Sequence, residues 1–167
     1  MIGLVRMTQE QYEKFFEEAV RGYAEENVNE GRWTASESIE RATKETNELL
    51  PNGIHTNGHY LCSLHHEVVG AIGTLWYAVT ESNSKKSAFI YSIQIDDEFQ
   101  GKGYGKQALM ALETDLAAMN VSSIGLHVFG HNKRAYQLYE KMGYVPKSIT
   151  MEKTLIRQEK QMNNLIT

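Results

Sequence analysis

The 167-residue sequence has a single cysteine and two prolines, and it lacks a long apolar run. One cysteine, Cys62, excludes an internal disulfide framework and fits a reducing compartment; we interpret it as a small core residue of a strand. The longest mostly apolar stretch, residues 68–79, falls well short of the roughly 20 residues that span a bilayer. The N-terminus lacks the basic and apolar regions of a signal peptide. We therefore expect a cytoplasmic protein that has no membrane partner.

Charge of neither sign is in large excess, with 21 acidic and 17 basic residues and a formal net charge of -4. This balance argues against nucleic acid as the partner, because nucleic-acid binding needs a basic surface. Hydrophobic residues are 41% and charged residues 23%, as in ordinary globular proteins. The chain contains no repeat, low-complexity segment or linker. We predict one domain over residues 1–155 and a polar C-terminal tail over residues 156–167.

Changes of hydrophobic period predict the element order β-α-α-β-β-β-α-β-α-β. The helices are expected to begin after a capping box at Thr8, at residue 35, near Lys106 and after a cap at Asn132. The strands are expected at residues 3–7, 60–64, 68–77, 87–95 and 123–129, followed by a closing strand pair at 144–150 and 151–155. Such alternation is typical of an α/β sheet that is antiparallel at hairpins and parallel at helical crossovers.

The glycine-rich stretch QGKGYGK, residues 100–106, lies between a strand and a helix. It is not a dinucleotide fingerprint, because Lys106 stands where the third glycine should be. It is not a Walker-type loop, because Gln100 and Gln107 hold the glycine and Ser/Thr positions. The stretch nevertheless keeps the physical feature that both motifs share. Bare backbone N–H groups and the positive end of a helix can converge on one anion. With Lys102 and Lys106 adding charge, we predict a phosphate or pyrophosphate site.

Two motifs carry a family resemblance. Residues 100–105 match the Q/R-x-x-G-x-G/A signature of the GNAT superfamily of N-acetyltransferases, and residues 132–144 match its N-x-x-A-x-x-L-Y-x-x-x-G-F/Y segment. The element order is similar to that of the family over residues 3–155, and the chain resembles small uncharacterised bacterial members. The resemblance implies a GNAT-like mixed, mostly antiparallel sheet whose central strands, residues 88–95 and 123–129, are splayed apart.

The resemblance also implies an acetyl-CoA-dependent N-acetyltransferase, an acyltransferase that moves an acetyl group directly from its co-substrate to a primary amine of a small molecule or peptide. The end of the central strand would pair with the pantetheine arm, and the glycine loop would bind the pyrophosphate. Asn132 would reach the pantetheine side, cap its helix, or do both. The implied cofactor-binding residues are Ile93, Gln94, Ile95, Gln100, Gly101, Lys102, Gly103, Tyr104, Gly105, Lys106 and Asn132.

For the chemistry, the resemblance makes Tyr139 the general acid that protonates the leaving thiolate; a core aromatic residue is the alternative. Several family members place a glutamate on the central strand as the base, but residues 88–95 contain no acid and Phe89 stands near that position. Tyr91, Ser92 and His127, acting directly or through water, are the alternatives for the base. The missing carboxylate also keeps open a non-catalytic acyl-CoA-binding or regulatory module.

The histidines lack the spacing of metal ligands, so we expect no metal site. The acids Glu25, Glu26 and Glu30 lie near Trp33, where they would attract a cationic amine or form a solvated helix face. The expected partner is thus an amine-bearing acceptor. Family analogy allows a monomer or a homodimer that associates through the sheet edge or the C-terminal tail.

Overall fold

One sheet organises residues 1–155, the part of the chain that this computed structural model describes; the predicted tail, residues 156–167, lies outside it. The strands are β1 (Ile2–Arg6), β2 (His59–His66), β3 (Gly70–Ser82), β4 (Lys85–Ile95) and β5 (Val121–Leu126). They form a five-stranded sheet in the order β1-β2-β3-β4-β5. Neighbouring strands are antiparallel except β4 and β5, which are parallel. The predicted mostly antiparallel α/β sheet is confirmed.

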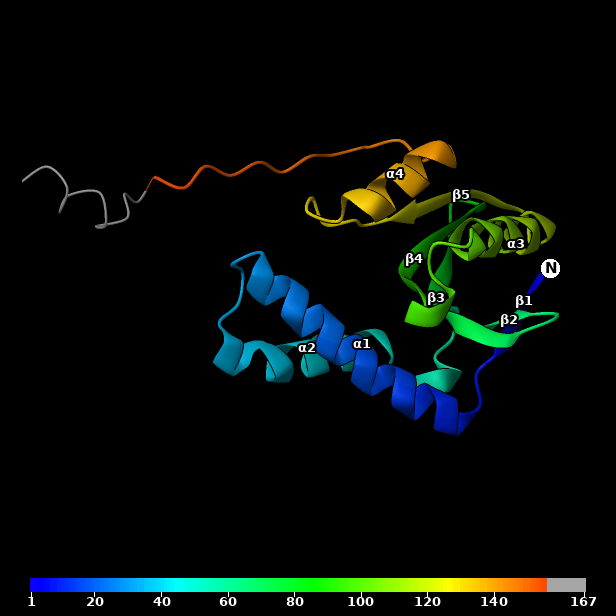
Figure 1. The fold of residues 1–167 in the computed structure, drawn as a ribbon, viewed down its shortest axis with the longest axis horizontal. Helices are drawn as coiled ribbons and strands as arrows, with labels where there is room; N and C mark the ends of the chain where they lie inside the picture. Colours follow the sequence, from blue (N-terminus) through cyan, green and yellow to red (C-terminus); the bar gives the residue numbers. More distant parts are fainter. Residues whose placement is uncertain (156–167) are drawn as a thin grey trace, which may run out of the picture.

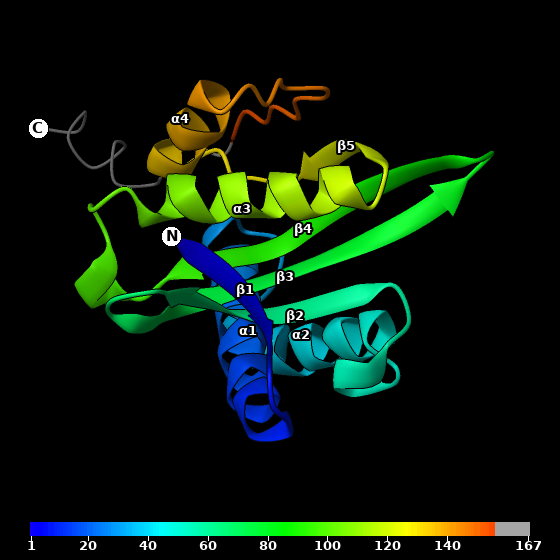
Figure 2. The ribbon, with the colours of Figure 1, turned by 90° about the vertical axis from the view of Figure 1, so that its right-hand side faces the viewer.

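Helices cover both faces of this sheet (Figures 1 and 2). The helix pair α1 (Gln9–Asn29) and α2 (Ala35–Leu49) lies on one face, and α3 (Tyr104–Ala118) lies on the other with α4 (Lys133–Lys141) beside it. Two short 3-10 turns, η1 (Gly53–His55) and η2 (Asp97–Phe99), complete the described elements. None of the helices in residues 1–155 combines the length and apolar character needed to cross a membrane.

The predicted capping box begins α1. The Thr8 hydroxyl accepts from Gln11 N at 3.2 Å, and the Gln11 side chain accepts from Thr8 N at 2.9 Å. Two N–H groups that the first turn would leave unpaired are thereby satisfied. The helix that the sequence places after the glycine loop begins at Tyr104, slightly earlier than predicted, and the hairpin strands β2 and β3 are longer than predicted.

Each face of the sheet buries its own cluster. The side of α3 holds the larger one, which includes Leu64, Ile72, Leu75, Ile90, Leu109, Leu112 and Leu116. The side of α1 holds a second one, which includes Tyr12, Phe15, Leu61 and Trp76. Cys62 belongs to the first cluster, and burial raises the pKa of its thiol to about 11, so the thiol stays protonated at neutral pH. The prediction of a core cysteine is confirmed.

Strands β4 and β5 separate partway along their length. Their last paired residues are Ile90 and Leu126, whereas β4 continues to Ile95 and there pairs with β3. Tyr91 is an extra residue at this point, since Tyr77 pairs with Ile90 and the preceding Trp76 pairs with Ser92. Such a bulge bends a strand and increases its twist. The predicted splay is therefore present, although β5 ends three residues before the predicted Phe129.

The predicted closing strand pair is wrong. Residues 144–155 follow an extended course without helix or strand and leave the body of the molecule beyond α4 (Figure 1). Alternating apolar and polar residues favour a strand, but a strand also needs a neighbour with free backbone groups. The local pattern specifies the conformation of this segment and does not specify which edge it pairs with.

Candidate active site

The glycine loop after β4 presents bare backbone to solvent. Gly101 and Gly103 have φ angles of 74° and 80°, in the left-handed region that favours glycine. A Cβ built on Gly103 would meet no protein atom within 4 Å, so the space above it is open. Gly103 is the N-cap of α3, and the first bond of the helix runs from Gln107 N to Gly103 O at 3.2 Å. The N–H groups of residues 103–106 therefore have no intrahelical acceptor and suit an anion.

Residue 105 is a glycine for a different structural reason, which is close packing between two helices. It lies inside the first turn of α3, and a Cβ at this position would stand 3.3 Å from Leu138 Cδ2 of α4. The absence of a side chain lets α4 approach the N-terminal turn of α3. The alternating glycines thus combine a loop conformation with close packing between helices.

The side chains of Gln100 and Lys102 hold the loop in place. Gln100 Nε2 donates to Ile95 O at 2.9 Å and to Asp97 Oδ1 at 3.0 Å. Lys102 Nζ donates to Glu98 O at 2.9 Å. These contacts fix the turn between β4 and α3, so the groups of the loop that are left for a ligand are its backbone N–H groups, with the exposed Lys106 beside them.

Tyr104 turns its ring toward the protein. The ring centre lies 5.1 Å from that of His66 and 6.4 Å from that of Phe99, and the ring packs against the larger core cluster. The backbone of Tyr104 therefore belongs to the predicted loop site, while its side chain anchors the helix.

The end of β4 offers a free backbone edge. Ile93, Gln94 and Ile95 pair with β3 on one side, and within residues 1–155 no strand pairs with them on the other. β3 approaches closely because it has Gly73 here, where a Cβ would collide with the Gln94 carbonyl group. This edge leads directly into the glycine loop, so backbone donors and acceptors precede the anion site along one path.

Asn132 and Tyr139 lie on α4. Asn132 Oδ1 accepts from Ala135 N at 3.2 Å, which confirms the cap, while its Nδ2 remains a donor for a ligand. Tyr139 is half-buried against the larger core cluster, with its ring 5.6 Å from that of Tyr144. Burial raises the pKa of Tyr139, so its hydroxyl stays protonated at neutral pH. Both a proton donor and a core aromatic residue fit this position.

The three candidate bases border the splay. Tyr91 occupies the bulge, and its ring stacks on Trp76 at 4.6 Å and on His59 at 5.6 Å. Ser92 follows it on β4, and the exposed His127 comes directly after β5. Phe89, near the position of the expected glutamate, is 39% exposed and has its ring 4.9 Å from Tyr91. An aromatic surface therefore stands where a carboxylate would be.

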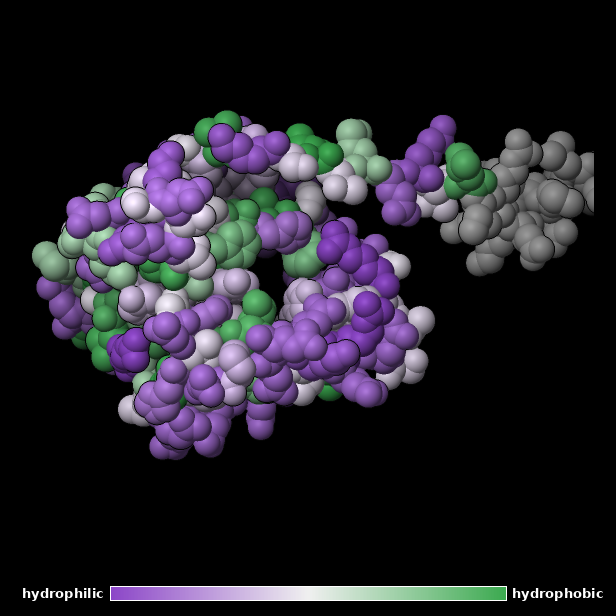
Figure 3. Space-filling model, turned by 180° about the vertical axis from the view of Figure 1, so that it is seen from behind, coloured by the Kyte–Doolittle hydropathy of each residue, from purple (hydrophilic) through white to green (hydrophobic). Residues whose placement is uncertain are grey.

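An ion-pair cluster that the sequence did not reveal joins α1 to the loop before α4. His131 Nδ1 is hydrogen-bonded to Glu30 Oε1 at 2.9 Å, and its Nε2 forms an ion pair with Glu26 Oε2 at 2.8 Å. The Glu30 hydrogen bond, together with the charges of both carboxylates, raises the pKa of His131. The only sequence signal was the spacing of the two acids, which places them on one face of α1. Figure 3 shows an opening between the helix pair and the rest of the molecule, bordered in part by hydrophobic residues.

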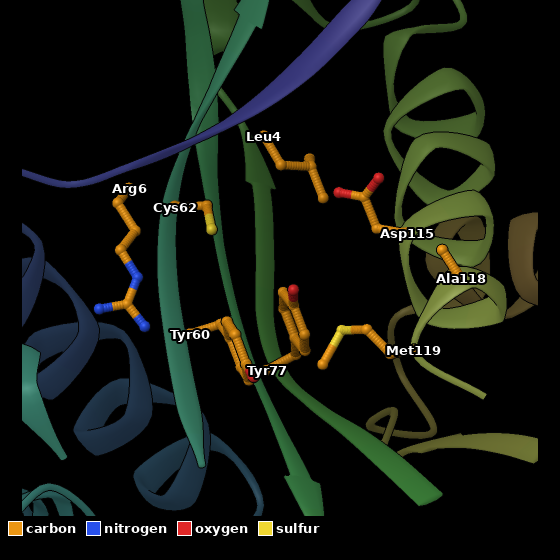
Figure 4. Close-up of a pocket in the computed structure, with 8 residues that line it drawn as sticks. All are labelled: Leu4, Arg6, Tyr60, Cys62, Tyr77, Asp115, Ala118 and Met119. Carbon is orange, nitrogen blue, oxygen red and sulfur yellow. The ribbon is translucent and has the colours of Figure 1, made fainter. Parts of the chain in front are cut away.

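A pocket of about 340 Å³ lies elsewhere, between the first three strands and the C-terminal end of α3 (Figure 4). The residues that line it include Arg6, Cys62, Tyr77 and Asp115. It lies apart from the glycine loop and from every predicted site residue. Within residues 1–155, no group of three or more His, Cys, Asp or Glu side chains could hold a metal ion.

Comparison with known proteins agrees with this geometry. The acetyltransferase (GNAT) family matches residues 8–144. Two uncharacterised N-acetyltransferases of Bacillus subtilis, YdgE and YycN, are each 34% identical to this chain. The match with YdgE covers 89% of this chain and 95% of YdgE, and the match with YycN covers 92% of this chain and 99% of YycN. The crystal structure of YycN, a putative acetyltransferase, superposes on this structure with a TM-score of 0.89 and 33% sequence identity. The superposition covers 94% of this chain and 100% of the YycN chain. The spermine/spermidine N(1)-acetyltransferase of Bacillus subtilis is 31% identical over 60% of this chain and 62% of its own. The family match covers most of this chain, and the structure has a free strand edge that leads into a glycine-rich helix N-terminus. This chain therefore belongs to the GNAT family of acetyltransferases.

Proposed function

We propose that this protein is an acetyl-CoA-dependent N-acetyltransferase that transfers the acetyl group directly to a primary amine of a small molecule or peptide in the cytoplasm. One observation carries the proposal: the free edge of β4 runs into the unpaired N–H groups at the start of α3. Acetyl-CoA has amide groups along its pantetheine arm and a diphosphate beyond them. The free edge of β4 suits the pantetheine amides, and the N–H groups at the start of α3 suit the diphosphate.

The backbone supplies most of the binding groups. Ile93, Gln94 and Ile95 pair with the pantetheine amides as a neighbouring strand would. The N–H groups of residues 101–106 donate to the diphosphate, which the positive end of α3 also attracts. Asn132 donates from Nδ2 to the pantetheine side while its Oδ1 caps α4.

The reaction forms a bond from the acceptor nitrogen to the acetyl carbon and breaks the bond from that carbon to sulfur. Tyr139 gives its proton to the departing sulfur, a role for which its raised pKa keeps it protonated. The proton of the amine leaves through Tyr91, Ser92 or His127, or through water that they hold. These groups border the place where β4 and β5 separate.

We propose a cationic amine as the acceptor. Glu26 and Glu30 stand at the end of α1, where their two negative charges exceed the single positive charge of a protonated His131 and attract a cation. The partial similarity to a spermine/spermidine acetyltransferase supports the same class of acceptor.

A second candidate function is a non-catalytic acyl-CoA-binding or regulatory module. The observation that favours it is Phe89, an exposed ring near the position of the expected carboxylate. In that case the protein would bind acetyl-CoA and would leave amines unmodified.

The deciding experiment measures the thermal unfolding midpoint with acetyl-CoA, CoA, NADH and ATP. A ligand at about 100 times its dissociation constant adds roughly 2.7 kcal/mol, which raises the midpoint by several degrees. We expect a shift with the two CoA species alone. A shift with NADH or ATP only, or with none of the four, would contradict the assignment of the loop.

Two glycine variants sharpen this experiment. Gly103→Val fills the open space above the loop and should abolish the CoA shift. Gly31→Val is the matched control, because Gly31 has a similar φ of 73° and equally open surroundings but lies outside the loop. Release of CoA thiol on adding amines then separates the enzyme from the binding module.

A further inference from the structure

The last turn of α3 leaves part of the sheet open, and the pocket of Figure 4 lies there. The helix contributes Asp115 and Ala118, whose side chains are short and do not fill the space above the strands. The strands contribute Leu4, Arg6, Tyr60, Cys62 and Tyr77. The volume of about 340 Å³ is near the lower end of the range for small-molecule sites, so the pocket suits a small ligand.

This pocket is separate from the proposed acetyl-CoA path. Tyr104 begins α3 at the glycine loop, whereas Asp115 lies about 16 Å further along the helix axis. The pocket is lined by β1, β2 and β3, whereas the path begins on β4. A ligand here would therefore occupy a second site, and its binding does not depend on acetyl transfer.

Tyr77 forms the inner wall of the pocket with an unpaired hydroxyl. The residue is 4% exposed, and its ring stacks on that of Tyr60, with the ring centres 4.8 Å apart and the planes 5° apart. Within residues 1–155 the Tyr77 hydroxyl has no hydrogen-bond partner, and burial is the main cause that raises its pKa. Figure 4 shows the hydroxyl pointing into the space among the lining side chains. A buried hydroxyl without a partner is costly, so a polar group of a ligand would stabilise it.

Two opposite charges line the same pocket without pairing. Arg6 ends β1 next to Cys62 of β2, and Asp115 comes from α3. Among the described residues neither takes part in an ion pair. Figure 4 shows them on opposite sides, with Cys62 and Tyr77 between them. The Arg6 guanidinium lies 5.6 Å from the centre of the Tyr60 ring, so the positive charge stands beside the aromatic wall.

We propose that this pocket binds a small zwitterion, with its carboxylate at Arg6, its ammonium group at Asp115 and an apolar chain between them along the Tyr77 ring. The guanidinium offers a carboxylate two parallel N–H groups, and the Asp115 carboxylate accepts from the ammonium group. The Tyr77 hydroxyl can donate to the carboxylate or accept from the ammonium group. A ligand with a single charge would leave either Arg6 or Asp115 without a partner.

The first test is calorimetric titration with 6-aminohexanoate, whose two charges are separated by an apolar chain. Hexanoate and hexylamine are the controls that each lack one charge. L-Leucine is an isomer of 6-aminohexanoate that carries both charges on one carbon. We expect 6-aminohexanoate to bind about tenfold or more tightly than each of the other three, because it alone reaches both charged groups. The absence of binding, or equal binding of the four compounds, would overturn the proposal.

The second test changes the three polar groups one at a time. Arg6→Gln and Asp115→Asn should each weaken the binding of 6-aminohexanoate about tenfold or more, and Tyr77→Phe about fivefold. Because Tyr77→Phe removes an unpaired hydroxyl, the unfolding midpoint should be equal or higher. Arg21→Gln and Glu40→Gln make the same changes of charge at exposed positions on α1 and α2 and should leave the affinity unchanged. Equal affinity in all five variants would contradict the assignment.

The third test separates this pocket from the proposed acceptor site, because 6-aminohexanoate is itself an amine. Ala118→Phe fills the pocket and should abolish binding. Ala117→Phe is the matched control, since Ala117 is also exposed in the last turn of α3 and is not among the residues that line the pocket. Circular dichroism should show an unchanged fold for both variants. Binding that Glu26→Gln weakens and Ala118→Phe leaves intact would place the compound at the acceptor site and exclude the pocket.

Discussion

The imidazole of His131 lies against the carboxylate of Glu26, with Nε2 and Oε2 2.8 Å apart, and so connects the loop before α4 to the end of α1. Glu30, the C-cap residue of the same helix, completes the contact. Its strength depends on the charge of the imidazole.

We expect this contact to stabilise the protein at low pH. The hydrogen bond to Glu30 and the nearby carboxylates raise the pKa of His131 in the folded state. The stabilisation is therefore fully present below the ordinary histidine pKa of about 6.5 and is lost as the pH rises through the raised value. The midpoint difference between wild type and His131→Gln should be larger at pH 5.5 than at pH 8.5. His55→Gln, at another exposed histidine, should show no such trend.

Tyr139→Phe should separate catalysis from packing. If the hydroxyl protonates the leaving thiolate, kcat should fall by about 10²-fold or more while the unfolding midpoint and the affinity for acetyl-CoA are retained. Steady-state kinetics and calorimetric titration measure the two quantities. An unchanged kcat would leave Tyr139 as a core aromatic residue.

Tyr144→Phe is the matched control for that variant. The Tyr144 hydroxyl is buried and has no hydrogen-bond partner among the described residues, and burial is the main cause that raises its pKa to about 12. Removing a buried unpaired hydroxyl should be neutral or stabilising. We expect an unchanged kcat and an equal or higher unfolding midpoint.

Glu26→Gln and Glu30→Gln should weaken the binding of the acceptor amine and leave the binding of acetyl-CoA unchanged. Each removes a negative charge at the end of α1, so KM for a cationic amine should rise on the order of tenfold with the affinity for acetyl-CoA unchanged. Glu25→Gln makes the same change of charge on an exposed neighbouring residue and should have little effect. Equal effects of all three variants would indicate a general charge effect instead of a specific site.

Gly73→Ala should destabilise the sheet strongly. A Cβ at this position would collide with the Gln94 carbonyl group, and moving β3 away would break its pairing with β4. We expect a loss of about 3 kcal/mol or more in the free energy of unfolding, measured in urea. Gly3→Ala is the control, because its Cβ would come no closer than 4.0 Å to its nearest contact.

Local patterns were predicted well from the sequence. The capping box of Thr8 and Gln11, the cap at Asn132 and the glycine loop each depend on residues a few positions apart, so the chain itself displays them. The splay of β4 and β5 came from the family resemblance. Its physical cause, the extra residue at Tyr91, is a matter of register between two strands, and the sequence shows it only as a shift of apolar positions from Ala88 and Ile90 to Ile93 and Ile95.

Features that depend on distant residues were missed. Glu26 and Glu30 sit one turn apart, but nothing near them indicates His131, which lies far along the chain. The close approach at Gly73 involves a carbonyl group of another strand. Residues 145–155 show the same limit, because their alternation is typical of a strand and does not specify a strand edge that would pair with it.

The bulge at Tyr91 changes which side of β4 each later residue faces. Before it, the even-numbered Ala88 and Ile90 face α3; after it, the odd-numbered Ile93 and Ile95 do. The consecutive Tyr91 and Ser92 consequently lie on the side of Trp76. Loss of the single codon for residue 91 would restore simple alternation along β4, so the change of face in this strand depends on one extra amino acid.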